Sequence, residues 1–156
     1  SQPTPAGITR IDVTSAQEMY QAVMQRIGTQ NVFIGVAAVS DYRPATLADH
    51  KIKKEDGAPP AVELVRNPDI LAEVAALPAA PLCVGFAAES RNLAEYAERK
   101  RRSKKIPLIV GNLIQDGFGG DSNAVTLFDD GGQTPLTPGS KLELARAIVA
   151  RIAALL

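Results

Sequence analysis

Cysteine, aromatic residues and an excess of either charge are what this sequence lacks. Its 156 residues include one cysteine, which excludes an internal disulfide framework and a zinc site built from several cysteines. Lysine plus arginine number 17, as do aspartate plus glutamate, so the formal net charge is +0. Proteins that coat nucleic acid usually carry a strong basic excess, so an anion-binding site here must be local.

Long apolar runs are absent as well. No stretch resembles a signal peptide, and no apolar segment is long enough to cross a bilayer. Hydrophobic residues make up 46% and charged residues 22%, a composition typical of a globular protein. Because no repeat or linker interrupts the chain, the sequence predicts a single domain over residues 1–156, in a cytoplasmic protein of a reducing compartment.

Helical and strand-like segments alternate along the chain. Apolar runs between turn signals predict strands buried on both faces at residues 31–38, 81–88 and 106–110, and a shorter strand at 61–65. Capping signals and helical spacing predict helices at residues 15–28, 67–77, 92–105 and from 140 onwards. This order predicts an α/β fold, a mostly parallel sheet with helices on both faces, followed by a hairpin of residues 125–129 and 134–136.

Ligands of such sheets bind beyond the carboxyl ends of the strands, so the residues that follow each strand are candidates. The strand at 31–38 ends with four small residues, Gly35, Val36, Ala37 and Ala38. They would let a flat ligand approach the backbone, but close packing of a helix explains them equally well. Asp41 follows directly and can bind a hydroxyl, a base amine or a hydrated metal, although a turn aspartate is the more common role.

A long polar loop occupies residues 40–60, a length typical of functional lids. It carries Lys51, Lys53 and Lys54, whose ammonium groups can fold over a polyphosphate and neutralise charge on a leaving group. A merely solvated loop is the common alternative. His50 is interpreted as a surface residue, because no nearby group fixes its tautomer.

Two further segments are candidates for the same site. Asn67, Pro68 and Asp69 signal a helix start with Asn67 at the N-cap, and free N–H groups there favour an anion. Plain capping explains these residue types equally well. Phe86, in the strand at 81–88, can lie against a nucleobase, although a core position is the default for an aromatic residue. Cys83, in the middle of the same strand, is predicted to be buried and not catalytic.

The helix at 92–105 ends in a basic run. Lys100 and Lys104 are four residues apart and therefore share one face of the helix. The helix dipole favours cations at this end in any protein, so the run has a structural explanation too. The glycine-rich residues 117–120 match neither the dinucleotide fingerprint nor the P-loop.

The order of these motifs resembles one family. The segments AAVSDYR (37–43), KIKK (51–54), NPDIL (67–71) and GFAAE (85–89) resemble phosphopantothenate–cysteine ligase, the phosphopantothenoylcysteine synthetase of coenzyme A biosynthesis. The resemblance spans nearly the whole chain. It implies a Rossmann-like fold and the CTP-dependent joining of cysteine to 4′-phosphopantothenate through an acyl-cytidylate. It also implies a homodimer, and a covalently linked decarboxylase half that would hold FMN.

The resemblance further implies a role for each candidate residue. Lys51, on a flap, would hold the triphosphate of CTP and stabilise the leaving pyrophosphate, and Ala38 would lie close to the acyl-cytidylate. Asp41 would contact CTP or its cation, which is expected to be Mg²⁺. Lys100 and Lys104 would complete the site, although a simple crossover would carry the end of their helix away from the crevice. The other residues expected around the nucleotide are Gly35, Val36, Ala37, Pro68, Asp69, Ile70, Leu71 and Phe86.

One departure from the family concerns the start of the chain. The family domain begins with a Gly-rich strand–turn–helix, whereas residues 1–5 resemble the linker that follows that unit. A truncated chain of little activity, with an exposed sheet edge, is therefore expected. Two alternatives stay open: a non-catalytic nucleotide- or partner-binding module of similar fold, and a nucleic-acid-binding domain that uses the basic run at 99–105.

Overall fold

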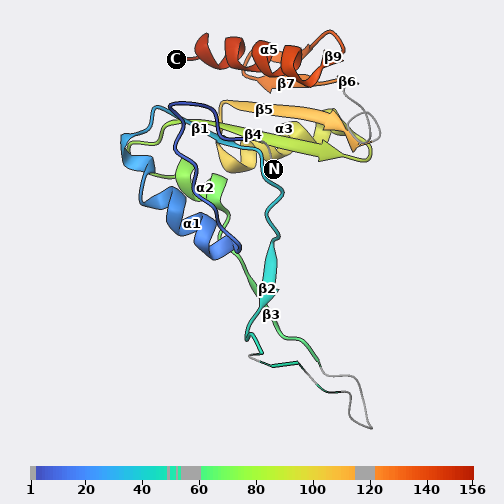
Figure 1. Ribbon diagram of the computed structural model, residues 1–156. Helices are drawn as coiled ribbons and strands as arrows, with labels where there is room; N and C mark the ends of the chain where they lie inside the picture. Colours follow the sequence, from blue (N-terminus) through green and yellow to red (C-terminus); the bar gives the residue numbers. More distant parts are fainter. Residues whose placement is uncertain (1–2, 49, 52, 54–60, 115–121) are drawn as a thin grey trace.

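A five-stranded sheet forms the centre of the molecule (Figure 1). The computed structural model describes residues 3–48, 50, 51, 53, 61–114 and 122–156. The strands lie in the order β1-β4-β5-β7-β8, in which β1, β4 and β5 are parallel and β7 and β8 are antiparallel to their neighbours. Their bounds are Val32–Gly35 for β1, Leu82–Glu89 for β4, Leu108–Leu113 for β5, Thr126–Asp129 for β7 and Gly132–Pro135 for β8. The mostly parallel sheet and the C-terminal hairpin predicted from the sequence are confirmed.

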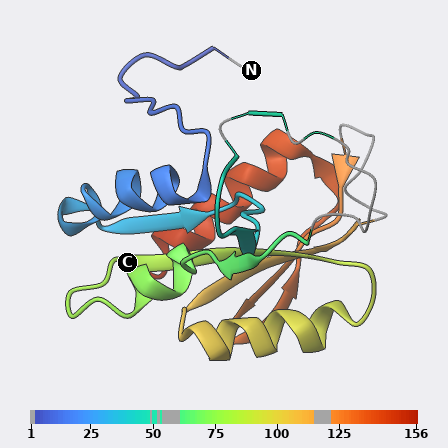
Figure 2. The ribbon, with the colours of Figure 1, turned by 90° about the horizontal axis from the view of Figure 1, so that it is seen from below.

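Helices cover both faces of this sheet, as predicted (Figure 2). Alternate residues of each strand point to opposite faces, so Cys83 of β4 packs with the first set of helices and Val84 with the last helix. One face carries α1 (Ala16–Met24), the 3-10 helix η1 (Ile27–Thr29), α2 (Ile70–Ala75) and α3 (Leu93–Lys104), and the other carries α5 (Lys141–Ala153). None of the helices in the described part of the chain is long and apolar enough to span a bilayer.

The strand β1 departs from its prediction. Instead of being buried on both faces, it is the edge of the sheet and pairs with β4 alone among the described strands. Ile34 and the following Val36 are 41% and 60% exposed. Both lie on the same side as Val32, which packs in the cluster beneath α5. The buried members of that cluster come from α5, β4, β5, β7 and Val125 just before β7, and none comes from β1, so α5 leaves this end of the face open.

A pair of short strands forms an arm that extends from the sheet (Figure 1). The strands β2 (Tyr42–Pro44) and β3 (Leu64–Arg66) are antiparallel, and Ala45 N–H continues the ladder with a 2.9 Å bond to the Glu63 carbonyl. The sequence predicted a strand at 61–65 but only a loop at 40–60. A second small ladder joins β6 (Ser122–Asn123) to β9 (Gly139–Ser140).

The start of α2 also differs from its prediction. Asp69, not Asn67, is the N-cap, and its carboxylate accepts the N–H of Ala72 at 3.1 Å. The helix has only six residues and starts at Ile70. Asn67 lies before the helix, and its side chain bonds to a different segment of the chain. One of the N–H groups that were expected to favour an anion, that of Ala72, is therefore already bonded to Asp69.

Candidate functional site

The strands β1 and β4 separate at their carboxyl ends, and this opening is where a parallel sheet binds its ligands. The β1–β4 ladder ends with the pair Gly35 and Gly85. Beyond it, β4 continues beside β5 as far as Glu89, whereas the chain after β1 turns into the arm at Tyr42. Predicted site residues from four segments flank this opening.

Lys100 reaches the point where the two strands separate. Its Nζ donates a 2.7 Å hydrogen bond to the carbonyl oxygen of Phe86, one residue after the last β1–β4 pair. Partial burial lowers the pKa of Lys100, and the charge of Lys104 lowers it further. The carboxylates of Glu89, Asp69 and Asp41 counteract this only in part, so the pKa stays below its usual value. The site therefore contains a cation that its own surroundings do not fully stabilise.

Lys104 completes a small cluster of charges with Lys100 and Asp69. Lys104 Nζ forms an ion pair with the Asp69 carboxylate, and the lysine side chain is only 17% exposed. Burial alone would raise the pKa of Asp69, but the bonds from Lys104 and Ala72 N–H and the two lysine charges outweigh it. The pKa of Asp69 is accordingly lowered. This ion pair joins the start of α2 to the last turn of α3. The chain enters β5 opposite Val84, before the last β1–β4 pair, so the expectation that the crossover carries the end of α3 away from the crevice stays a prediction.

The base of the arm is held next to this cluster by Asn67. Its backbone N–H donates to the Asp41 carbonyl at 2.9 Å, and its side-chain Nδ2 donates to the Ser40 carbonyl at 2.9 Å. Arg43 Nη1 donates to both Asn67 Oδ1, at 3.1 Å, and the Arg66 carbonyl, at 2.8 Å. These bonds join the segment after β1 to the start of α2. The sequence indicated a polar residue before Pro68 but not this bridging role.

A hollow of about 420 Å³ lies on the other side of the same segment. Ala37 and Ala38, both exposed, form part of its wall, as do Asn67 and Arg43. The opposite wall is the start of α1, including its N-cap Ser15. Of the four small residues at the end of β1, Ala37 and Ala38 thus line this hollow, and that they bind a ligand stays a prediction.

Several predicted residues lie elsewhere. Ile70 is 8% exposed and belongs to the core, whereas the half-buried Leu71 lies over Gly35 and Gly85, the last pair of the β1–β4 ladder. The ring of Phe86 packs against the cluster beneath α5, and only its carbonyl meets Lys100. Pro68 is half-buried between Asn67 and the N-cap. Lys51 is exposed beyond the end of the β2–β3 ladder, with no bond to the lysine cluster in the part described. Lys54 and residues 117–120 lie outside the described residues.

The glycines at the two strand ends have different reasons to be small. A Cβ added to Gly85 would lie 2.8 Å from side-chain carbons of Leu71 and Ile109, so these side chains would have to shift to admit it. A Cβ at Gly35 would meet its nearest neighbours at 3.7 Å, an ordinary contact. The helix α2 therefore packs closely against Gly85, whereas at Gly35 it leaves space for a Cβ in ordinary contact.

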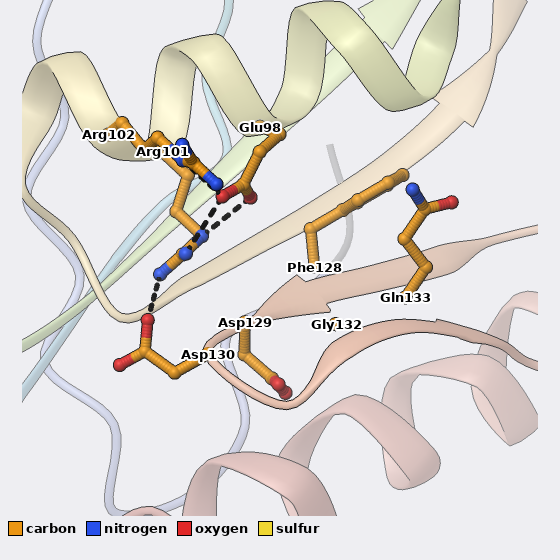
Figure 3. Close-up of a pocket in the computed structure, with 8 residues that line it drawn as sticks. All are labelled: Glu98, Arg101, Arg102, Phe128, Asp129, Asp130, Gly132 and Gln133. Atoms are coloured by element: carbon orange, nitrogen blue, oxygen red, sulfur yellow. Dashed lines mark hydrogen bonds and ion pairs between the residues drawn. The ribbon is translucent and has the colours of Figure 1, made fainter.

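A second hollow, of about 390 Å³, lies at the opposite edge of the sheet (Figure 3). Its main feature is an ion network in which Glu98 binds Arg101 at 2.8 Å and Arg102 at 2.7 Å. Arg101 also binds Asp130 at 2.8 Å, which fastens the β7–β8 turn to α3. The two arginines lower the pKa of Glu98 to about 2. This hollow contains none of the predicted site residues, and each of its charged side chains already has an ion-pair partner.

Comparisons with known proteins agree with the resemblance drawn from the sequence. The family described as "DNA/pantothenate metabolism flavoprotein C-terminal domain" matches residues 1–156. The chain is 43% identical to the coenzyme A biosynthesis bifunctional protein CoaBC of Vibrio vulnificus (strain YJ016), over 100% of this chain and 40% of that protein. For the protein of the same name from Escherichia coli (strain K12), the identity is 48% over 82% of this chain and 33% of that protein.

Solved structures extend the comparison. The crystal structure of the C-terminal domain of coenzyme A biosynthesis bifunctional protein CoaBC matches with a TM-score of 0.79 and 34% identity, over 99% of this chain and 71% of that one. The DNA/pantothenate metabolism flavoprotein from Streptococcus pneumoniae has a TM-score of 0.81 at 18% identity, which shows the shared fold alone. The chain spans about two fifths of the length of the Vibrio relative.

Proposed function

The chain belongs to the family of the DNA/pantothenate metabolism flavoprotein C-terminal domain, and from this we infer that it is the phosphopantothenate–cysteine ligase domain of coenzyme A biosynthesis. In the reaction that we propose, the carboxylate of 4′-phosphopantothenate attacks the α-phosphorus of CTP and pyrophosphate leaves. The amine of cysteine then attacks the acyl carbon of the acyl-cytidylate, and CMP leaves as the amide forms.

One observation carries this proposal: the half-buried Lys100 and the adjacent Lys104 lie beside the opening between β1 and β4. The lowered pKa of Lys100 reflects burial and the repulsion between the two lysines. A bound polyphosphate would supply the negative charge that this pair lacks, and it would do so where substrates of parallel sheets bind. Such preorganised cations stabilise the charge that develops on a leaving pyrophosphate.

The remaining residues act around these two lysines. Ala37 and Ala38 would leave room for the nucleotide and for the acyl-cytidylate. The exposed Lys51, which the β2–β3 arm carries, would bind the phosphates. Mg²⁺ would neutralise part of the triphosphate charge. The described residues include no cluster of three or more His, Cys, Asp or Glu side chains suited to a metal. We therefore propose that the ion is held mainly by the phosphates, as Mg²⁺ commonly is, with Asp41 as its contact in the protein.

Calorimetry and product analysis test this function. We expect CTP to bind more tightly than ATP or UTP, and pyrophosphate release to require 4′-phosphopantothenate as well. Mass spectrometry should detect the amide product only when cysteine is added. Lys51→Gln should weaken CTP binding, whereas Lys141→Gln, an exposed lysine at the start of α5, should not. Equal binding of all nucleotides would contradict the proposal.

The length of the relatives determines which proteins to assay. Because the chain spans about two fifths of the Vibrio relative, the same measurements are made on the full product of its gene. A homodimer, tested by light scattering, is part of the proposal.

A non-catalytic nucleotide-binding module is the second candidate. The observation in its favour is that Lys51 lies on the arm, apart from the lysine cluster. CTP binding without pyrophosphate release from either the chain or the full gene product would support that candidate over the ligase.

A further inference from the structure

We propose that Asn67 is a positioning residue for this reaction: its side-chain amide fixes the base of the β2–β3 arm to the start of α2, and so holds Asp41 and Lys51 in place relative to the lysine cluster. The inference rests on the proposed function, since it assigns a role within that site. It concerns a residue that the sequence suggested only as a helix cap.

Three polar groups of Asn67 bond to the segment that follows β1. The backbone N–H donates to Asp41 O, Nδ2 donates to Ser40 O, and Oδ1 accepts from Arg43. The side-chain partners are 27 and 24 residues away in the sequence, so the bonds join two distant parts of the chain. The half-buried side-chain amide thus uses both its nitrogen and its oxygen to bind one short segment.

The Asn67 amide lies between the segment after β1 and the start of α2, so it can set the positions of both. On one side it holds Ser40 and Asp41, which follow directly from the open end of β1. On the other side it precedes Asp69, the N-cap of α2 and the ion-pair partner of Lys104, by two residues. The arm that leads to Lys51 starts at the same place. A hydrogen-bonded amide here therefore connects the opening, the arm and the lysine cluster.

Loss of the Asn67 amide should free the base of the arm to move, while the β2–β3 ladder stays intact. The backbone ladder from Tyr42–Arg66 to Pro44–Leu64 does not depend on the Asn67 side chain. In an Asn67→Ala variant only the two side-chain bonds disappear, so the arm would persist but pivot at its base. Asn67→Asp keeps the acceptor for Arg43 but places a carboxylate against the Ser40 carbonyl, where it cannot donate.

Both variants are tested by CTP calorimetry and by hydrogen exchange. We expect Asn67→Ala and Asn67→Asp each to weaken CTP binding by roughly tenfold, the effect of losing a positioning hydrogen bond. Backbone amides of residues 40–45 and 63–67 should exchange faster, while those of β5 should not change. Asn31→Ala is the matched control, since the Asn31 side chain is exposed and makes no hydrogen bond among the described residues.

A double-mutant cycle distinguishes positioning from a general loss of structure. If Asn67 acts by placing the arm, the loss from Asn67→Ala should be several-fold smaller in a Lys51→Gln background than in the natural chain. Fully additive losses, or an Asn67→Asp variant with unchanged affinity, would overturn the proposal. If the natural chain binds no CTP, the proposed function fails, whatever Asn67 does. The role of Asn67 is then tested by hydrogen exchange alone: unchanged exchange at residues 40–45 in the Asn67→Ala variant would refute the bridge. If Asn67→Ala does not fold, Arg43→Met removes one bond of the bridge and is read in the same way.

Discussion

Replacement of Lys100 by methionine should separate stability from binding. Methionine keeps the length and apolar stem of the side chain but removes the charge and the 2.7 Å bond to the Phe86 carbonyl. In the proposed site the Lys100 ammonium group binds a polyphosphate. The substitution should therefore weaken ligand binding although the fold tolerates it. We expect the Lys100→Met chain to be about as stable as the natural chain and to bind CTP much more weakly.

The expected magnitudes follow from the surroundings of Lys100. Loss of this hydrogen bond from a charged donor costs about 1.5–3 kcal/mol, and relief of the desolvation and of the repulsion from Lys104 returns a similar amount. The net change in the free energy of unfolding should therefore lie within about 1 kcal/mol. A charge-assisted contact to a phosphate contributes about 1.5–3 kcal/mol, so the Kd for CTP should rise by roughly tenfold to a hundredfold.

The pH dependence of stability provides an independent check that the pKa of Lys100 is lowered and not raised. Because the pKa of Lys100 is lowered from its usual 10.5, the unfolded chain holds more protons than the folded chain between the lowered pKa and 10.5. The natural chain should therefore gain stability as the pH rises through this window, a gain that Lys100→Met lacks. Urea unfolding at several pH values and CTP calorimetry measure both effects, with the exposed Lys141→Met as control. A variant that unfolds readily yet binds CTP normally would refute the reasoning.

Three further predictions concern the framework around the site. The ion pairs of Glu98 stabilise the fold fully above pH 4.5 and are lost as the pH falls to the Glu98 pKa of about 2. The stability of the Glu98→Gln variant, measured by circular dichroism, should therefore fall less across that range than the stability of the natural chain. Arg151→Met leaves the buried Asp129 without its 2.7 Å partner and should cost about 2–3 kcal/mol in urea unfolding. Asp129→Asn should cost less, about 1–2 kcal/mol, and the reverse order would contradict this assignment. Gly85→Ala should destabilise by about 1–3 kcal/mol in thermal unfolding because its Cβ has no room. Gly35→Ala, with contacts at 3.7 Å, should change the stability by less than about 1 kcal/mol.

Local signals in the sequence were sufficient for most of the fold. Apolar runs located β4 and β5 to within three residues, because buried parallel strands need continuous hydrophobic sequence. The capping box of Ser140 and Glu143 located the start of α5, and both of its hydrogen bonds are present. These features depend on residues close together in the chain, which is why a single sequence predicts them.

Features that depend on distant residues were missed. The strand β2 consists of Tyr42, Arg43 and Pro44, all exposed, so no alternation of apolar and polar residues indicates it. Its ladder forms only because β3 lies opposite. The N-cap of α2 was placed two residues too early, since Asn67 is an equally good cap until its bonds to Ser40 and Arg43 are known. The position of this N-cap therefore depends on hydrogen bonds to residues that are distant in the sequence.

The lysine cluster shows how packing, and not spacing, brings the candidate site together. The sequence places Lys100 and Lys104 on one face of a helix but does not say what that face meets. In the structure, the absence of a side chain at Gly85 lets Leu71 of α2 pack directly onto β4. This close approach brings the first turn of α2, with Asp69 at its N-cap, against the end of α3, where Lys104 binds it. Gly85 thus acts through the approach of a helix, and the proposed polyphosphate site depends on it indirectly.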